Sequence, residues 1–340
     1  MMDVGQKSTK TAAETLVTVF GGSGFVGRHV VRALAKRGYR VRVAVRRPDL
    51  AGFLQPMGGV GQIHAVQANL RYPDSVMAAV HGADAVVNLV GILQEGGRQS
   101  FSAVQANGPR AIAQACARAG ISRLVQVSAI GADAASSSVY ATSKAEGEAA
   151  VLGQVPTAVI LRPSIVFGPE DGFFNRFASL ARMLPVLPLV GGGDTLFQPV
   201  FVGDVAEAVA LAIDGKAKPG ATYELGGPER KSFRQLLEYV CEVTGRKRLL
   251  ANLPFPLARI QAGAIEIANK LTFGLLPDEL LLTRDQVELL KSDNVVAEAA
   301  IIEGRTLAGL GIVPSSVEAI VPSYLWRFRK SGQFDTAKTG

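Results

Sequence analysis

Short apolar runs alternate with amphipathic stretches through the first half of the chain. Residues 16–20 (LVTVF) are apolar and β-branched, as a buried parallel strand is, and residues 25–36 carry apolar side chains at helical spacing. Further strand-like runs occupy residues 40–45, 63–68, 85–90, 124–128 and 158–161, and helical patterns cover 102–119 and 140–152. This alternation predicts an α/β fold with a Rossmann-type, doubly wound parallel sheet, which binds ligands at the carboxyl ends of its strands.

The pattern changes after Pro163. Residues 169–198 are rich in Pro, Gly and Phe, whereas residues 199–225 again resemble sheet elements. We therefore expect an NAD(P)-binding domain over residues 15–168, which 199–225 rejoin, and a smaller, discontinuous C-terminal lobe for a substrate or partner. The lobe is predicted to comprise 169–198 and 226–330, with mobile tails at 1–14 and 331–340.

Composition and charge narrow the classes of function. The chain is 48% hydrophobic and only 19% charged, so it has ample material for a core. The 36 Lys and Arg exceed the 29 Asp and Glu by 7, a mild positive balance that favours nucleotide phosphates or acidic lipid headgroups. The basic residues are not concentrated as in a nucleic-acid-binding arm. We expect no nucleic-acid partner and assign no metal site.

Targeting signals and cysteines bear on localisation. The first residues are polar, and no stretch offers the roughly 20 uncharged apolar residues of a membrane-spanning helix. Cys116 and Cys241 lie in helix-like apolar patterns, which favours buried thiols in a reducing compartment over a disulfide. We expect a cytoplasmic protein, either free or peripheral on the cytoplasmic face of the inner membrane.

The glycine-rich turn after the first strand fits two motifs at once. Gly22, Gly24 and Gly27 form G-x-G-x-x-G, whereas Gly21, Gly24 and Gly27 form G-x-x-G-x-x-G. Either spacing lets the backbone turn tightly and approach a pyrophosphate, whose charge then meets a helix N-terminus. The alternative is an ordinary glycine-rich turn, but the flanking strand and helix favour a dinucleotide site.

The residues after the second strand indicate which dinucleotide binds. NAD sites place a carboxylate there for the ribose hydroxyls, whereas this chain has Arg46 and Arg47. Guanidinium groups offer paired donors to a 2′-phosphate, so these residues, with Arg28 as a helper, favour NADP(H) over NAD(H). Asp49 lies too far along the chain to replace the missing acid. The alternative interpretation is a solvated basic turn.

Tyr140 and Lys144 form a Y-x-x-x-K pair on one helical face, and Ser128 closes the fifth strand. The Lys144 ammonium is expected to favour the Tyr140 phenolate and so lower the pKa of that hydroxyl, while Ser128 holds a substrate oxygen. Asn107 lies on the preceding helix, where it could organise a water or Lys144. The alternatives are a partly buried Tyr beside a surface Lys and, for Asn107, a polar spot in a helix.

Together these residues resemble the extended and atypical branches of the short-chain dehydrogenase/reductase superfamily over residues 15–168 and 200–212. The resemblance makes G-x-x-G-x-x-G the operative spacing, and it implies that residues 88–91 and 161–169 surround the nicotinamide. Asn69 stands where relatives commonly carry an Asp near the adenine. The full set expected at the cofactor is Gly21, Ser23, Gly24, Phe25, Val26, Gly27, Arg28, Arg46, Arg47, Asn69, Leu70, Val90, Gly91, Lys144, Pro163 and Ser164.

Five longer segments carry a more specific resemblance: TVFGGSGFVGRHVV, YATSKAEGEAAV, ILRPSIVFGPEDGFFNRFASLA, FQPVFVGDVAEAVA and YLWRFRKSGQF. They are similar to the NADPH-binding accessory subunit family of respiratory complex I (NADH:ubiquinone oxidoreductase) and its bacterial relatives. This resemblance implies NADPH binding without an established redox turnover, at the junction of the peripheral arm and the membrane.

One departure separates the hypotheses. Nucleotide-sugar epimerases of this branch carry an Arg-Asp pair where this chain has Phe197 and Gln198, so the natural counter-ion of a sugar-nucleotide diphosphate is missing. An epimerase or dehydratase is therefore disfavoured. Two hypotheses stay open: an NADPH-binding protein associated with complex I or its assembly, and a free NADP-dependent oxidoreductase for a small or apolar, quinone-like carbonyl compound. The retained Ser128, Tyr140 and Lys144 keep turnover an open question.

A basic and apolar stretch of the lobe points to a surface. Arg246, Lys247 and Arg248 precede a helical pattern in which apolar side chains share one face. The apolar positions of that face are Leu257, Ile260, Ala264, Ile267 and Leu271. We predict an amphipathic helix that lies on an anionic bilayer or on a membrane subunit. The alternative is a helix packed into the core of the lobe.

Overall fold

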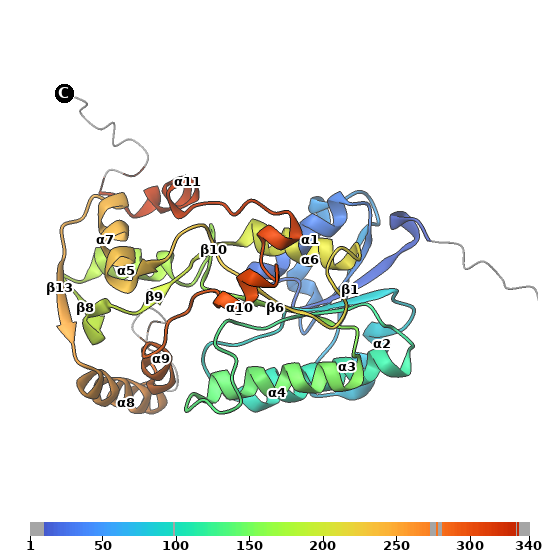
Figure 1. The fold of residues 1–340 in the computed structure, drawn as a ribbon, viewed down its shortest axis with the longest axis horizontal. Coiled ribbons are helices and arrows are strands. Elements are labelled where there is room, and N and C mark those ends of the chain that lie inside the picture. Colours follow the sequence, from blue (N-terminus) through green and yellow to red (C-terminus); the bar gives the residue numbers. More distant parts are fainter. Residues whose placement is uncertain (1–9, 98, 273–276, 278–280, 331, 333–340) are drawn as a thin grey trace, which may run out of the picture.

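The computed structural model shows a parallel sheet covered by helices, with a smaller lobe beside it (Figure 1). It describes residues 10–97, 99–272, 277, 281–330 and 332. Within these residues the main sheet has seven strands in the order β11-β6-β5-β4-β1-β2-β3, all paired in parallel. They are β1 (Leu16–Phe20), β2 (Arg40–Val45), β3 (Ile63–Gln67), β4 (Ala85–Asn88), β5 (Leu124–Val127), β6 (Val159–Pro163) and β11 (Thr222–Leu225). The predicted Rossmann-type fold is confirmed.

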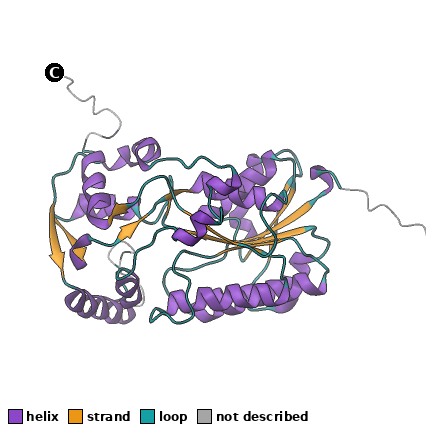
Figure 2. Cartoon of the chain, viewed as in Figure 1, coloured by secondary structure: helices purple, strands orange, loops and turns teal. Residues whose placement is uncertain are grey.

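Helices enclose the sheet on both faces, as Figures 1 and 2 show. Helices α1 (Phe25–Lys36) and α6 (Val202–Ile213) pack together on one face, and α2 (Pro73–Val80), α3 (Gly108–Arg118) and α4 (Val139–Gln154) cover the other. Each face has its own apolar core, one around Val19 and Leu34 and the other around Phe20 and Ile160. Burial on both faces explains why the central strands β1 and β4 are apolar almost throughout. The outer strands β2, β3 and β11 include polar and charged residues.

The strand order reverses between β1 and β4. From β1 the chain adds β2 and β3 on one side, and then crosses over to add β4, β5 and β6 on the other. The loops that follow β1 and β4 therefore run in opposite directions and leave a crevice at the carboxyl edge of the sheet, where such folds bind ligands. The glycine turn and the segment that begins at residue 89 border this crevice.

The glycine turn is held in place by close backbone packing. Gly21 has a positive φ of 78°, and a Cβ atom at this position would lie 3.2 Å from the Val90 amide nitrogen. A Cβ at Gly27 would lie 2.2 Å from the Gly21 carbonyl oxygen, so no other residue fits there. Gly22 is more than a small turn residue, because its Cβ would lie 2.8 Å from the Val43 side chain.

The lobe has its own apolar core, which includes Phe167, Phe174 and Leu236. Its helices are α5 (Phe174–Met183), α7 (Phe233–Val243), α8 (Phe255–Leu271), α9 (Arg284–Leu289), α11 (Val317–Ile320) and α12 (Pro322–Leu325). Its strands pair as β8 (Val186–Val190) with β13 (Leu249–Leu253) and β9 (Leu196–Phe197) with β12 (Lys231–Ser232), while β7 (Val166–Phe167) and β10 (Val200–Phe201) pair beside the main sheet. None of the helices in the described residues is long and apolar enough to cross a membrane.

Aromatic packing explains the Phe-rich segment of the lobe. The rings of Phe173, Phe177, Phe197 and Phe233 lie within 6.3 Å of one another in several pairs. Phe197 is 8% exposed, and it occupies the core of the lobe where epimerases carry their diphosphate-binding Arg. Of the two cysteines, Cys116 is buried and Cys241 half-buried, and both are free thiols.

Part of the predicted lobe packs on the sheet domain instead. Leu307 and Ile312 belong to the core of the α1/α6 face, although they lie within residues 226–330. The Glu224 amide of β11 donates to the Arg305 carbonyl at 2.9 Å, so this segment runs along the edge of the sheet. Its return was not visible in the sequence because α10 (Glu298–Ile302) and its flanking turns are short.

The ends of the chain differ partly from the predicted tails. Residues 1–9, 331 and 333–340 lie outside the described residues. Residues 10–14, predicted as part of a mobile tail, are ordered by contacts: Lys10 pairs with Asp84 at 2.6 Å, and Thr11 and Glu14 form a capping box around a short 3-10 helix. The ordered chain therefore begins before residue 15.

Candidate nucleotide and catalytic site

Three elements converge at the crevice where the cofactor was predicted. The glycine turn lies against Val90, and the next residue, Gly91, would place a Cβ 3.2 Å from the Lys144 Nζ atom of α4. Ser23 lies in the same turn, Phe25 and Val26 begin α1, and all three are half-buried. The structure thus brings the glycine turn, the end of β4 and helix α4 together at the crevice, where folds of this kind bind dinucleotides.

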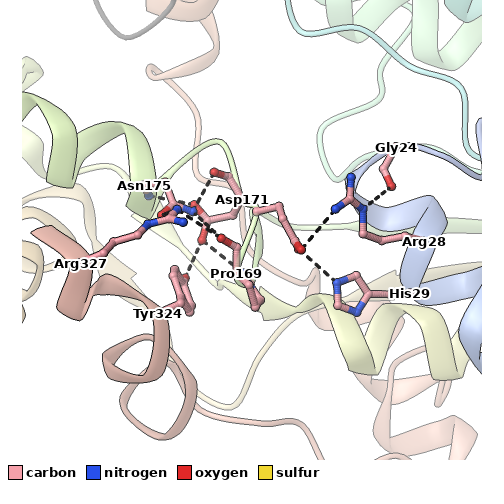
Figure 3. A network of polar contacts seen from close by, with 10 residues as sticks. Gly24, Arg28, His29, Pro169, Asp171, Asn175, Tyr324 and Arg327 are labelled. Atoms are coloured by element: carbon pink, nitrogen blue, oxygen red, sulfur yellow. Dashed lines mark hydrogen bonds and ion pairs between the residues drawn. The ribbon is translucent and has the colours of Figure 1, made fainter. Parts of the chain in front are cut away.

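The predicted 2′-phosphate ligands differ in what they contact. Arg47 forms an ion pair with Asp49 at 2.7 Å. Arg28 lies 5.0 Å from the centre of the Phe53 ring and contacts the Gly24 carbonyl and Glu170, at 3.4 and 3.3 Å (Figure 3). Arg46 is exposed and has no hydrogen-bond or ion-pair partner among the described residues. Arg46 could therefore donate to a phosphate without breaking an ion pair, unlike Arg47 and Arg28.

The polar atoms of other residues predicted to contact the cofactor form hydrogen bonds within the protein. The Asn69 Oδ1 atom accepts the Arg71 amide at 3.2 Å and so shapes the turn after β3. The Ser164 hydroxyl, one residue beyond Pro163 at the end of β6, donates to Asn294 of the lobe at 2.7 Å. Leu70 packs against Gly108 at the start of α3. These contacts indicate that the three residues shape the walls of the crevice.

Tyr140 and Lys144 lie close together on α4, and Ser128 directly follows β5 at the carboxyl edge of the sheet. Lys144 is 8% exposed, and its Nζ atom lies 5.7 Å from the centre of the Tyr140 ring. The edge of the Phe101 ring packs against Tyr140 with 5.7 Å between ring centres. The Ser128 Oγ atom is buried and has no hydrogen-bond partner among the described residues. Such an unpaired buried hydroxyl marks a place where a ligand oxygen can bind.

The electrostatics of the pair differ from the sequence expectation. Burial, and then the charge of Asp285, raises the pKa of Tyr140 to about 12, whereas Lys144 was expected to lower it. Burial lowers the pKa of Lys144 to about 8, against the opposing charge of Glu148. Burial therefore shifts each of the two groups toward its neutral form. Tyr140 therefore keeps its proton at neutral pH.

Asn107 does not reach the site. Its side chain is exposed, and its Oδ1 atom accepts from Arg110 at 3.1 Å. The π-helix Ser102–Asn107 that precedes α3 instead turns Gln105 inward, where its Nε2 donates to the Ile92 carbonyl at 2.7 Å and its Oε1 has no partner among the described residues. The extra residue per turn of a π-helix shifts which side chains face inward, and the sequence carries no signal of it.

Asp285 is a residue of the site that sequence reasoning missed. It lies on α9 of the lobe, and its carboxylate accepts the Val139 amide at 2.7 Å and the Ser138 hydroxyl at 2.9 Å. It thus caps the N-terminus of α4, the helix that carries Tyr140, where a negative charge is favourable. The segment TRDQ was recognisable only as the start of its own helix, because nothing local shows that Asp285 serves a second one.

Comparison with known proteins agrees with this geometry. Residues 17–226 match the NAD dependent epimerase/dehydratase family. The chain belongs to this family, the extended branch of the short-chain dehydrogenases/reductases, whose members bind NAD(P) on a Rossmann fold. It is 36% identical over 325 residues to the mitochondrial "NADH dehydrogenase (ubiquinone) 1 alpha subcomplex subunit 9" of Arabidopsis thaliana, which covers 93% of this chain and 79% of that protein. The predicted resemblance to accessory subunits of complex I is confirmed.

Other relatives are reductases and epimerases. The "Ceramide reductase" of Caulobacter vibrioides is 31% identical over 282 residues, which cover 81% of this chain and 86% of that protein. Among solved structures, gox2253 superposes with a TM-score of 0.69 at 24% identity over 93% of this chain and 98% of that one. The UDP-glucose 4-epimerase of Thermus thermophilus in complex with NAD gives a TM-score of 0.56 at 28% identity, over 71% of this chain and 86% of that one.

Lys144→Met is expected to stabilise the fold at pH 7, because it removes a buried ammonium. The folded-state pKa of Lys144 is lowered from 10.5 to about 8, so between those values the unfolded state binds more protons and the wild type gains stability as pH rises. The advantage of the variant should therefore shrink between pH 8 and 10. Urea unfolding of both proteins across this range measures it. With the exposed Lys36→Met as a control the difference should not vary, and a constant difference for Lys144→Met would contradict the assignment.

Proposed function

We propose that this protein binds NADP(H) in the crevice between β1 and β4 and associates with respiratory complex I, or with its assembly, on the cytoplasmic face of the inner membrane. Its similarity to subunits of NADH dehydrogenase over most of its length supports the partner. The observation that carries the membrane location is the exposed apolar face of α8.

That face is unusual because its large side chains point outward. Ile260 and Leu271 are 69% and 74% exposed, and Leu257 and Ile267 are also more than half exposed. The small residues Ala258 and Ala262 are fully buried and pack toward Val287 of α9. A core helix has the opposite arrangement. The exposed face therefore supports the amphipathic surface helix predicted from the sequence over the core-packed alternative.

The uncommitted guanidinium of Arg46 supports NADP(H) as the nucleotide. It lies directly after β2, where a carboxylate would hold the ribose of NAD. Arg47 and Arg28 already contact Asp49 and Glu170. Binding of NADP(H) stabilises the fold by mass action whether or not a hydride is transferred. A structural role for the nucleotide needs no substrate.

Arg46→Ser is expected to weaken NADPH binding by about 10- to 100-fold, the loss of one charge-assisted contact of about 1.5–3 kcal/mol. NADH binding should change little, because NADH has no 2′-phosphate. Titration of nicotinamide fluorescence measures both affinities. Arg47→Ser is the matched control and should cost less, since Arg47 pairs with Asp49. Equal affinities of the wild type for NADPH and NADH would refute the preference.

Ile260→Glu combined with Ile267→Glu is expected to release the protein from native membranes, because two charges on the apolar face oppose its burial against lipid or a membrane subunit. Fractionation of cell extracts, followed by identification of the proteins that co-purify with each version, measures this. The exposed Val60→Glu on the sheet domain is the control. A double variant that still co-purifies with membrane subunits as the wild type does would rule out this face as the contact.

A second function, reduction of an apolar carbonyl compound, is favoured by the protonated Tyr140. When bound, NADPH supplies the hydride of such a reaction. Ser128 would hold the carbonyl oxygen through its unpaired hydroxyl, and Tyr140 would pass its proton to that oxygen as charge develops. Lys144, close to Tyr140 and to the Gly91 backbone, would then favour the resulting phenolate. The relative named ceramide reductase supports an apolar substrate.

Tyr140→Phe separates the two functions. Single-turnover oxidation of bound NADPH, followed by absorbance in the presence of long-chain ketones and quinones, should proceed in the wild type and fall by about 100-fold or more in the variant. NADPH affinity should be unchanged, because the phenyl ring remains. An oxidation rate that Tyr140→Phe does not alter would contradict the catalytic assignment. If the wild type binds NADPH but oxidises none of it, only the structural role of the nucleotide remains.

A further inference from the structure

Five arginines of the lobe lie close together around Phe328 and the end of α5. They come from three segments: Arg182 from the end of α5, Arg246 and Arg248 from the turn before β13, and Arg327 and Arg329 from the chain after α12. Backbone carbonyls hold them in place. Arg246 donates to the Phe328 carbonyl at 3.0 Å and Arg248 to the Ala181 carbonyl at 2.6 Å. Arg329 closes the set by donating to the Val243 carbonyl at 2.9 Å.

The Phe328 ring lies at the centre of this arginine cluster. The guanidinium carbons of Arg182 and Arg327 lie 5.8 and 5.2 Å from the centre of the ring. Arg327 also contacts Asn175 and the Pro169 carbonyl, as Figure 3 shows. Arg182, Arg327 and Phe328 line one side of a hollow of about 830 Å³ between the lobe and the sheet domain. Its other walls include Ile92 and Glu95 after β4, Asp171, and Asn269 of α8. Cation and ring contacts thus fix both guanidinium groups at the rim of an open hollow.

The positive charges of the cluster are not neutralised within the protein. In the described part of the chain, none of the five arginines forms an ion pair with a carboxylate, whereas Arg37 and Arg162 each pair with two. Burial, and then the charges of Arg248 and Arg182, lower the pKa of Arg246. Each guanidinium has five N–H donors, and the carbonyl contacts use only some of them. The cluster therefore lacks anionic acceptors and repels itself.

We propose that the arginine cluster is a binding site for the phosphate headgroup of an anionic phospholipid. Guanidinium groups match phosphate oxygens through paired hydrogen bonds, and several of them around one hollow suit a headgroup better than an isolated charge does. This proposal rests on the proposed membrane association. It adds a headgroup-binding site to the apolar contact made by α8.

The chain between the cluster and α8 favours a lipid over a free anion or an acidic protein. Strand β13 follows Arg248 directly and leads to α8, and its five residues span about 16 Å. Leu249 at its start is 67% exposed. Figure 1 shows β13 at the outer side of the lobe, where it joins the turn after α7 to α8, so one short strand separates the two arginines of that turn from the helix with the apolar face. An anionic phospholipid could contact both features, because its phosphate headgroup would bind the arginines and its acyl chains would contact the apolar face of α8.

The test compares Arg182→Gln combined with Arg327→Gln against the wild type in binding to phosphatidylcholine vesicles with and without about a fifth phosphatidylglycerol. The wild type is expected to bind the anionic vesicles, and the double variant to bind about 30-fold more weakly, since each arginine near an anionic surface contributes about a fivefold factor. Arg71→Gln combined with Arg118→Gln removes the same charge from exposed positions of the sheet domain and should bind as the wild type does. NADPH affinity reports that each variant is folded.

The outcomes separate the headgroup site from the proposed membrane location. If the double variant binds anionic vesicles as the wild type does, the headgroup site is wrong while membrane association stands. If wild type binds no vesicles, both the site and the lipid contact of α8 are wrong. Inorganic phosphate and poly-glutamate test the two alternative ligands, a free anion and an acidic protein. If the wild type binds either of these probes but does not bind vesicles, the lipid proposal is overturned.

Discussion

The close approach of α1 to the turn after β1 is the contact on which the sheet domain depends. A Cβ at Gly27 would lie 2.2 Å from the Gly21 carbonyl oxygen, so the helix can start at this angle only with glycine. That angle directs the helix N-terminus into the crevice and brings the turn against Val90 at the end of β4. The same helix then packs on α6, which the chain forms only after a first excursion into the lobe. The close contact between Gly27 and Gly21 thus affects both the glycine turn at the crevice and the packing of α6 against α1.

Burial sets the chemistry of the candidate site more than charge pairing does. Burial pushes the half-buried Tyr140 and the buried Lys144 each toward its neutral form. The cap that holds their helix comes from Asp285 in the lobe, and the adjacent Arg284 amide donates to Glu266 of α8 at 2.9 Å. Helix α8 and the helix that carries Tyr140 are therefore connected through α9 of the lobe. A function at a surface and a function at the nucleotide site are compatible in this arrangement.

Periodic features were predictable from the sequence, and contacts between distant segments were not. The strands around Val19 and Val87 follow from uniform apolar runs, and the exposed face of α8 from the spacing of Leu257, Ile260 and Ile267. Asn107 was misplaced because a π-helix changes the inward face locally. The direction of the Tyr140 pKa shift was wrong because burial and Asp285 depend on tertiary packing. The arginine cluster combines three segments whose proximity no local pattern reports.

The segment that runs along β11 has a consequence for how the protein is made. β11 is an edge strand of a parallel sheet, and its free side is covered by residues 297–312 through the Arg305 carbonyl and the Ala297 amide, which donates to Glu224 at 2.8 Å. Open strand edges invite pairing with other chains. Because these residues follow every strand of the sheet in sequence, the sheet emerges from the ribosome with this edge bare. The interval between synthesis of β11 and synthesis of its cover is when the nascent chain is most exposed to aggregation.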